Sequence, residues 1–136
     1  MVEHPNAMRF RAFYDALSAG DAEALLNTLS PDVRFHVPGD GMLAGEYEGI
    51  QGVATLGLRA AAETNGTFKL DLLDVIANDT YAVSRHRWTA ERDGRRIEMN
   101  NMNAYRFDAA GKIVERWEFI EDQRTHDDFW APEPKR

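Results

Sequence analysis

The most regular alternation of hydrophobic and polar residues lies between Thr80 and Glu121. Val, Thr, Trp and Tyr alternate there with polar and charged residues, as in strands that bury one face. Two turn signals divide this stretch, at residues 92–95 (Arg-Asp-Gly-Arg) and 108–111 (Asp-Ala-Ala-Gly). Asp-Gly favours a type I′ hairpin because both central residues of that turn need a positive φ. The pattern predicts three consecutive long strands, at residues 81–91, 96–107 and 112–121.

The first half of the chain combines helical spacing with shorter strand patterns. Phe10 and Phe13 begin an apolar series at helical spacing, which indicates an amphipathic helix. Residues 38–49 contain four glycines, which predicts a loop. The predicted helices of this half are 6–19, 22–29 and 50–63, and the predicted strands are 33–37 and 68–77.

The order of elements is therefore helix, helix, strand, helix and four strands (ααβαββββ), which predicts an α+β fold. We expect a curved antiparallel sheet wrapped around helices, a cone-shaped α+β barrel. One domain is expected over residues 1–136, with its core at about 8–130. A sheet with helices on its concave side encloses a pocket, and such pockets are default binding sites. The tail after residue 121 is polar, with Phe129 and Trp130 as candidate anchors.

Composition narrows the range of partners. The chain has 136 residues, a net charge of −7 and a pI near 5.0, so we expect no nucleic-acid partner, because phosphate binding needs a basic surface. No cysteine is present, which excludes disulfides and thiolate nucleophiles. No apolar run approaches the roughly 18 residues of a membrane span, and no secretory signal is visible. A cytoplasmic protein without a membrane partner is expected.

Strand periodicity sorts the residues of the three predicted long strands into two faces. The expected inward set combines apolar residues with two amides, and buried amides need hydrogen bonds. It consists of Ser84, His86, Trp88 and Ala90 with Ile97, Met99, Asn101, Asn103, Tyr105 and Phe107.

The last predicted strand has two candidate inward faces. Apolarity alone mildly favours the face with Trp117 and Phe119 as core, although a dimer interface explains these aromatic residues equally well. The first face carries Val114, Arg116, Glu118 and Ile120, and the second carries Ile113, Glu115, Trp117, Phe119 and Glu121.

Local motifs give the chain a resemblance to a known superfamily. They are residues 14–21 (Tyr-Asp-Ala-Leu-Ser-Ala-Gly-Asp), 35–39 (Phe-His-Val-Pro-Gly), 45–49 (Gly-Glu-Tyr-Glu-Gly) and 105–114 (Tyr-Arg-Phe-Asp-Ala-Ala-Gly-Lys-Ile-Val). With them the chain resembles the nuclear transport factor 2-like superfamily of cystatin-like α+β barrels, in particular its SnoaL-like and ketosteroid-isomerase-related members. That superfamily includes isomerases, dehydratases, epoxide hydrolases, polyketide cyclases and proteins that only bind, so the fold does not give the reaction.

The resemblance to ketosteroid isomerase implies which of its functional positions survive. Its carboxylate base falls on Val37, and its tyrosine donor falls on Phe13, with Tyr14 one step away. Its second donor, a protonated aspartate, falls on Asn103. One polar donor is retained and the base is missing, which argues against steroid isomerisation by that mechanism.

Two other groups of relatives suggest acid/base positions. The Asp-Arg-Asp set of limonene epoxide hydrolase matches partially, with Glu118 on the last strand and His86 and Trp88 at the other two places. The acid/base aspartate of SnoaL-like cyclases falls on Glu121 or Asp122. In these relatives the inward face of the last strand is the one with Arg116, Glu118 and Ile120. We adopt that face, which leaves Trp117 and Phe119 on the outer sheet face used for dimers in the superfamily.

The candidate site is assembled from these assignments, each against a structural alternative. His86 is a candidate general acid/base, because imidazole as a group titrates near neutrality, and the alternative is a core histidine hydrogen-bonded to Asn101 or Asn103. Glu118 is a base or an ion-pair partner of Arg116. His36 lies at the pocket rim, although the alternation of the strand directs its side chain away from the cavity. Asp122 is an acid/base candidate or only the start of the tail. Tyr14 is expected to form a wall of the pocket instead of donating a hydrogen bond. His4 and His126 are assigned to flexible termini. The candidate catalytic residues are His86, Glu118, Asp122 and His36, and the candidate substrate-binding residues are Tyr14, Trp88, Asn101, Asn103, Tyr105 and Arg116.

Two functions follow from different classes. The first is a cofactor-free acid/base enzyme of isomerase, cyclase, dehydratase or hydrolase type that acts on a hydrophobic, oxygenated small molecule. The second is a non-catalytic ligand-binding or assembly domain, which the loss of a carboxylate at Val37 favours. In both cases a homodimer through the outer sheet face is expected. No metal or cofactor is expected, because His36 and His86 lack the spacing of metal ligands.

Overall fold

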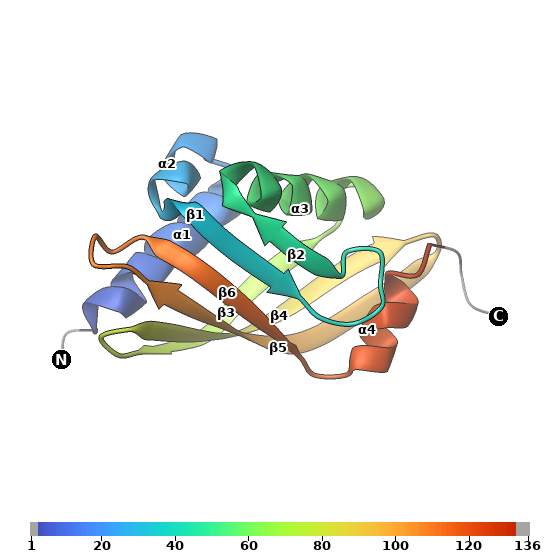
Figure 1. The fold of residues 1–136 in the computed structure, drawn as a ribbon. Coiled ribbons are helices and arrows are strands. Elements are labelled where there is room, and N and C mark those ends of the chain that lie inside the picture. Colours follow the sequence, from blue (N-terminus) through green and yellow to red (C-terminus); the bar gives the residue numbers. More distant parts are fainter. Residues whose placement is uncertain (1–2, 133–136) are drawn as a thin grey trace.

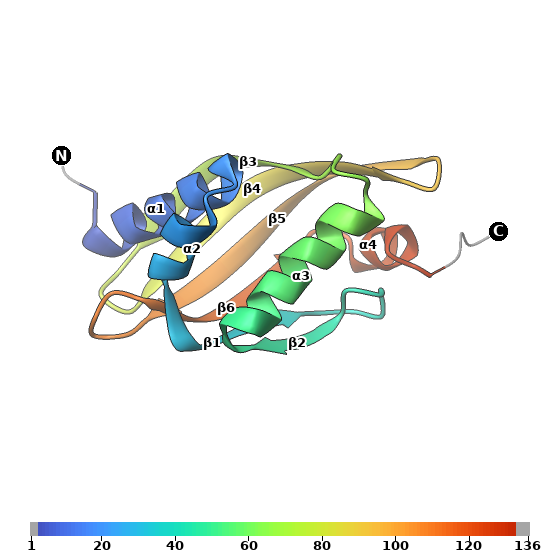
Figure 2. The ribbon, with the colours of Figure 1, turned by 90° about the horizontal axis from the view of Figure 1, so that it is seen from above.

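The computed structural model describes residues 3–132, in which a curved sheet is covered on its concave side by helices (Figure 1). Seen from above, α1 and α2 lie over one end of the sheet, α3 lies beside them, and α4 lies near the opposite end (Figure 2). The helices are α1 (Pro5–Ala19), α2 (Ala22–Asn27), α3 (Gly49–Glu63) and α4 (Gln123–Phe129). The strands are β1 (Leu29–Val37), β2 (Gly45–Glu48), β3 (Lys69–Ala77), β4 (Tyr81–Arg92), β5 (Arg95–Phe107) and β6 (Ile113–Ile120). The expected α+β class is confirmed.

The sheet has the strand order β2-β1-β6-β5-β4-β3. Its neighbours are antiparallel except for β1 and β6, which run parallel. The expectation of a fully antiparallel sheet is therefore wrong at this one pair. A parallel pair needs a long crossover between its strands, and all of the chain between residues 37 and 113 serves as that crossover here.

The hairpin between β4 and β5 has the predicted turn. Asp93 and Gly94 have φ values of 51° and 75°, as a type I′ turn requires of its two central residues. The two strands pair over their whole length, from Tyr81 opposite Arg106 to Arg92 opposite Arg95. This long ladder is the main pairing of the sheet, and its register determines which of the site residues described below lie opposite one another.

Two predicted boundaries in the first half of the chain are wrong. The second helix ends at Asn27, and Leu29 already belongs to β1, where it is buried and pairs with Ile113. The predicted loop at residues 38–49 contains β2, whose Tyr47 pairs with Phe35. Both corrections have the same cause, because strand pairing outweighs helix propensity and loop composition.

The polar tail contains a helix that the sequence reading missed. Asp122 is the N-cap of α4, and its carboxylate accepts hydrogen bonds from the Thr125 backbone N–H (3.1 Å) and hydroxyl (2.9 Å). Phe129 and Trp130 are buried, so their prediction as anchors is confirmed. His126 is also buried, so its assignment to a flexible terminus is wrong.

Two aromatic clusters fill the space between helices and sheet. One joins Phe10 and Phe13 of α1 to Phe35 and Tyr105, with ring centroids 4.9–6.4 Å apart. In the other, the Trp130 ring stacks on Trp88 of β4 at 6.1 Å. Aromatic contacts of this kind dominate the energetics of small cores. Within residues 3–132, none of the helices has the length and apolar character needed to cross a bilayer.

Candidate functional site

Polar side chains project from the inner face of β4, β5 and β6 between the two aromatic clusters. Cross-strand register brings them together, because Ser84 pairs with Asn103, His86 with Asn101, and Asn103 with Glu118. Directly opposite residues on one face of a sheet have their Cβ atoms about 4.5–5.5 Å apart. We call the following set the inner polar cluster: Ser84, His86, Asn101, Asn103, Arg116 and Glu118.

The inward face of β6 is the one with Arg116 and Glu118. Arg116 is buried, whereas Phe119 on the other face is 59% exposed. The start of the strand departs from both candidate faces, because Ile113 is fully buried and Val114 is not. An irregularity in the pairing with β5 at this point inserts one residue, and such a bulge reverses which side chains point inward.

His86 is buried, with 5% of its surface exposed, and lies on the inner face as predicted. Among residues 3–132 its ring has no hydrogen-bond partner, so the alternative of a bond to Asn101 or Asn103 is wrong. Burial, followed by the positive charge of Arg116, lowers the pKa of His86 from 6.5 to about 4. The imidazole is therefore neutral at pH 7 and has two nitrogen atoms without a protein partner.

Arg116 is a buried cation with incomplete hydrogen bonding. Its guanidinium lies over the Phe35 ring, 4.5 Å from the centroid, and its Nη1 lies 3.3 Å from Oδ1 of Asn103 in the amide orientation that suits the neighbours of Asn103. Its Nη2 lies 3.3 Å from Oε2 of Glu118, so the predicted ion pair is present. Within the described chain, however, neither Nε nor Nη2 has a hydrogen-bond acceptor.

The other predicted binding residues of β4 and β5 are all buried. In its suitable orientation, the Asn101 amide accepts a hydrogen bond from Nε1 of Trp88 (2.8 Å), and the Asn103 amide lies 3.2 Å from the Tyr105 hydroxyl. Burial raises the pKa of Tyr105, so this hydroxyl stays protonated. These contacts fix the two amides but use only part of their hydrogen-bonding capacity.

Tyr14 is held by the backbone of β3 instead of facing the cluster with a free hydroxyl. Its hydroxyl donates to the Leu70 carbonyl (2.8 Å) and accepts from the Leu72 N–H (3.0 Å). The pairing of β3 with β4 shifts register between Leu72 and Asp74. Tyr14 therefore supplies partners that an irregular strand needs, and the assignment as a wall residue fits better than a substrate donor.

Two of the predicted catalytic residues lie outside the inner polar cluster. His36 is on the outer face of β1, where its Nε2 lies 2.6 Å from Oε2 of Glu115 and its Nδ1 lies 3.2 Å from Oε1 of Glu46. Asp122 is exposed at the start of α4, and its hydrogen bond from the Thr125 backbone lowers its pKa. Strand parity places His36 outside, and helix capping explains Asp122.

His126 of α4 is a residue near the cluster that sequence reasoning missed. It is buried against Trp88, with ring centroids 5.8 Å apart. Burial lowers its pKa, and the negative charges of Glu118 and Asp127 oppose this effect. The sequence held a signal for this helix, because Asp122 is a good N-cap and His126 and Phe129 follow at helical spacing.

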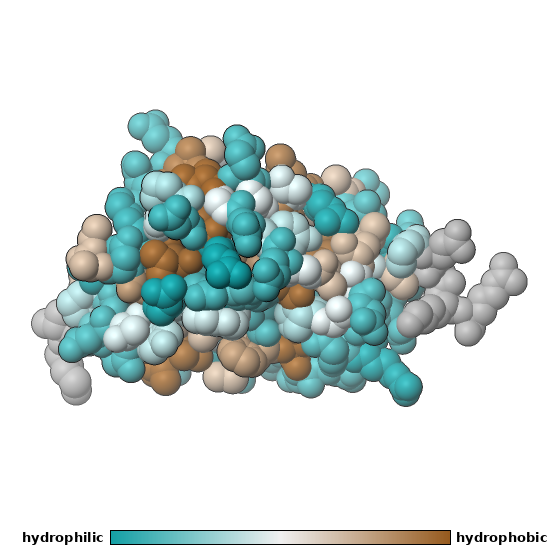
Figure 3. All heavy atoms as spheres, viewed as in Figure 1, coloured by the Kyte–Doolittle hydropathy of each residue, from teal (hydrophilic) through white to brown (hydrophobic). Residues whose placement is uncertain are grey.

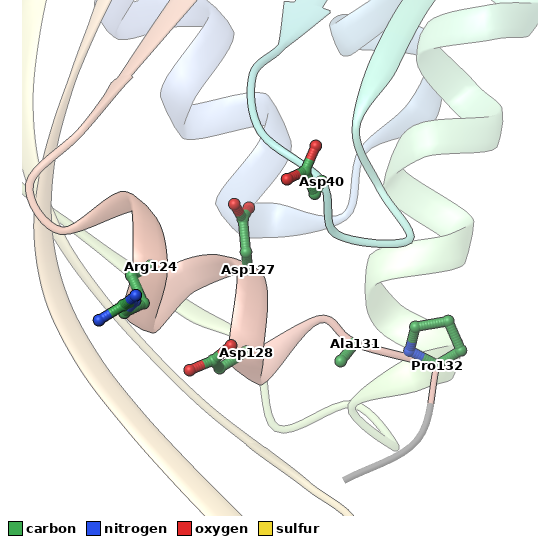
Figure 4. Close-up of a pocket in the computed structure, with 6 residues that line it drawn as sticks. All are labelled: Asp40, Arg124, Asp127, Asp128, Ala131 and Pro132. Atoms are coloured by element: carbon green, nitrogen blue, oxygen red, sulfur yellow. The ribbon is translucent and has the colours of Figure 1, made fainter. Parts of the chain in front are cut away.

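A hollow of about 260 Å³ lies between α4 and the loop after β1 (Figure 4). In the close-up, Asp127 of α4 points toward Asp40 of that loop, whereas Arg124 lies on the other side of the helix. A smaller hollow of about 90 Å³ lies on the outer sheet face beside Ile76 and Met102. Neither hollow is lined by the inner polar cluster. In the described chain, no three histidine or acidic side chains come together as metal ligands.

Comparison with known proteins places the chain in a family. A family model described as SnoaL-like domain matches residues 10–116. The uncharacterized protein Mb0035 of Mycobacterium bovis is 34% identical over 123 residues, which are 89% of this chain and 92% of that protein. The structure of Bal32a, from a soil-derived mobile gene cassette, has a TM-score of 0.88 at 31% identity and covers 93% of this chain and 96% of its own.

A more distant structure shares the fold. IdmH, a putative polyketide cyclase from Streptomyces antibioticus, has a TM-score of 0.71 at 20% identity. The match covers 87% of this chain and 93% of that chain. The family model and the relatives above 30% identity confirm the resemblance that the sequence motifs indicated, and the chain belongs to the SnoaL-like domain family.

Proposed function

We propose that this protein binds a hydrophobic, oxygenated small molecule at the inner polar cluster and acts on it by cofactor-free acid/base chemistry. The observation that carries the proposal is a pair of buried groups with unmet hydrogen bonds, His86 and Arg116. Leaving such groups unsatisfied costs about 1–3 kcal/mol each. A fold that keeps them beside one another has a reason other than stability, and a polar group of a bound ligand supplies the missing partner.

The chemistry assigned to each residue follows from its charge. His86 is the proton acceptor, because burial keeps its imidazole neutral. Arg116 and Asn103 stabilise an oxyanion that develops on the ligand. The charge of Arg116 contributes to the low pKa of His86, so an oxyanion beside Arg116 offsets that charge and makes His86 a stronger base. Glu118 is the second proton carrier. Isomerase, cyclase, dehydratase and hydrolase reactions all fit these roles.

A non-catalytic binding domain is the second candidate, and one observation favours it. Val37, at the position of the carboxylate base in ketosteroid isomerase, is 7% exposed and belongs to the hydrophobic core. An imidazole with a pKa of about 4 is also a weak base in the ligand-free protein. In this second function the cluster orients a ligand without reacting with it.

Turnover separates the two functions. A thermal-shift screen of steroids, terpenoids and polyketides identifies a ligand, and its conversion is then followed by mass spectrometry. We expect His86→Ala and Glu118→Gln each to lower kcat by about 10²–10⁴-fold. The matched controls His36→Ala and Glu115→Gln remove the same residue types from the outer face and are expected to keep activity. Unchanged rates in both inner variants, with ligand binding retained, contradict the enzyme and support the binding domain.

We also propose that a second copy of the chain covers the outer sheet face. Phe119 and Ile76 are 59% and 65% exposed there, and Figure 3 shows hydrophobic residues among polar ones along the lower edge of the molecule. Light scattering after size exclusion is expected to give a dimer mass. Phe119→Asp should give a monomer, whereas Leu58→Asp on the exposed face of α3 should not. A monomeric wild-type protein at all concentrations contradicts this proposal.

A further inference from the structure

Arg116 presents one complete edge of its guanidinium without acceptors. The Nε and Nη2 groups of an arginine carry two nearly parallel N–H bonds that match the two oxygens of a carboxylate. In Arg116 both atoms are buried, and both lack a hydrogen-bond acceptor within residues 3–132. Nη1 on the opposite edge is the nitrogen that Asn103 contacts. Within the described chain, the guanidinium is therefore contacted by an amide oxygen at one edge and has two donors without hydrogen-bond acceptors at the other.

The same molecule shows what this edge looks like when it is occupied. At the surface, Nε of Arg11 donates to Oε1 of Glu3 (2.7 Å) and Nη2 donates to Oε2 (2.8 Å), which is a complete bidentate pair. Beside Arg116, one oxygen of Glu118 lies 3.3 Å from Nη2 but makes no hydrogen bond with it. Glu118 balances the charge of Arg116 and leaves its two donors unused.

Neighbouring aromatic rings hold the Nε–Nη2 edge of Arg116 in a fixed orientation. The Phe35 ring lies under the guanidinium at 4.5 Å, and the register of β5 and β6 places Tyr105 opposite Arg116. Phe13 packs edge-on against Phe35 and tilted against Tyr105. A planar donor pair beside aromatic rings suits a ligand that has a carboxylate on an apolar body.

We propose that the Nε–Nη2 edge of Arg116 binds the carboxylate of the ligand, so that this protein acts on hydrophobic carboxylic acids. This inference rests on the proposed function, because it names the ligand class of the same site. Both nitrogen atoms are closed off from solvent, so binding requires the surrounding side chains to move apart. The charge of Glu118 opposes the ligand carboxylate, so neutralising Glu118 should strengthen binding.

The test compares the binding of a carboxylate, 2-naphthoate, with the binding of its neutral counterpart, 2-naphthamide. Both are measured by NMR and by calorimetry. The Nε–H resonance of Arg116 is identified by its absence in Arg116→Lys. We expect 2-naphthoate to shift this resonance and to bind about 10–100-fold more tightly than the amide. Arg116→Lys keeps the charge but loses the bidentate edge and should lose that preference, whereas Arg106→Lys on the outer face should keep it. Glu118→Gln should tighten 2-naphthoate binding several-fold, and Glu115→Gln should not.

The outcomes separate this inference from the proposed function. Equal binding of acid and amide inside the barrel, or an Arg116 resonance that neither molecule moves, overturns the carboxylate site. If Arg116→Lys fails to fold and leaves the resonance unassigned, the affinities of the wild-type protein for 2-naphthoate and 2-naphthamide, measured by calorimetry, still decide between these outcomes. A shifted Arg116 resonance together with full turnover in His86→Ala supports the carboxylate site and contradicts the acid/base enzyme.

Discussion

The inner and outer faces of the sheet each carry a histidine, an arginine and a glutamate, but the two sets differ in how completely their polar groups are paired. On the outer face, Glu115 receives a short contact from His36 (2.6 Å) and a hydrogen bond from Arg106 (3.2 Å). Burial raises the pKa of Glu115, but these two partners outweigh it and lower the pKa overall. On the inner face, considering residues 3–132, His86 has no hydrogen bond and Arg116 keeps two buried donors without acceptors.

This difference distinguishes paired charges on the outer face from incompletely paired charges on the inner face. The outer charges meet partners beside water, where such pairs contribute about 0–1 kcal/mol. The inner charges have lost their hydration without gaining complete partners, which is unfavourable. Apolar residues at the inner positions would give a more stable sheet. Within the described residues, the inner polar cluster is therefore a place where the native arrangement is less stable than an apolar one, and the predictions below test that interpretation.

The largest expected difference between the faces concerns packing. Trp130 is almost completely buried and stacks on Trp88, so Trp130→Ala should lower the free energy of unfolding by about 3–5 kcal/mol. Phe119 on the outer face is mostly exposed, and Phe119→Ala should change the free energy by less than about 1 kcal/mol. Urea denaturation at a concentration that keeps the protein monomeric measures both. Similar losses in the two variants would show that the outer aromatic residues also belong to the fold's core.

The next effect is a pH dependence that comes from the inner face. The pKa of His86 is about 4 in the folded protein, against an ordinary value of 6.5, so the unfolded chain binds a proton first as the pH falls. The free energy of unfolding should therefore be highest above pH 6.5 and fall between pH 6.5 and 4, by roughly 3 kcal/mol from this residue. Burial of His126 lowers its pKa in the same direction.

His86→Asn isolates this contribution. Urea denaturation from pH 4 to 8 should show a smaller slope in the variant, with the two proteins parallel above pH 7, where the imidazole is neutral in both states. The hydrogen bond from the Thr125 backbone lowers the pKa of Asp122. Burial raises the pKa of Asp127, but hydrogen bonds, led by the one from Gln123, outweigh burial and lower this pKa overall. The stability that these carboxylates contribute is therefore lost only in more acidic solution than the contribution of His86. If the variant kept the wild-type slope between pH 4 and 6.5, residues other than His86 would be responsible for the pH dependence.

The smallest effect is a gain in stability. Replacing a buried ion pair with neutral side chains of similar size is often neutral or stabilising by about 1–4 kcal/mol. We expect the double variant Arg116→Met with Glu118→Gln to gain about 1–2 kcal/mol and to lose ligand binding. The outer counterpart, Arg106→Met with Glu115→Gln, should change stability by less than about 1 kcal/mol. Thermal and urea unfolding give both values, and a large loss in the inner variant would make the pair a stabilising one.

Sequence reasoning located the inner face of β4 and β5 correctly. His86, Asn101 and Asn103 were assigned inward from alternation alone, and all are buried. It was less successful where a single inserted residue changes the direction of the side chains, and where a helix or strand is short. The irregularity near Val114 reverses the parity at the start of β6. β2 has four residues and α4 has seven, so the periodicity of each is a weak signal, because a pattern gains strength from several repeats.

The α+β class, the type I′ turn at Asp93 and Gly94, and the direction of most side chains on the long strands could be predicted from the sequence. These depend on residues that are neighbours along the chain, where backbone geometry is local. Three features of the described chain emerge only from its folding in space: His86 lacks a hydrogen-bond partner, Arg116 has two donors without acceptors beside Glu118, and His126 lies near them. Hydrogen-bond partners depend on the register of separate strands and on how a terminal helix packs, and no short stretch of sequence specifies these.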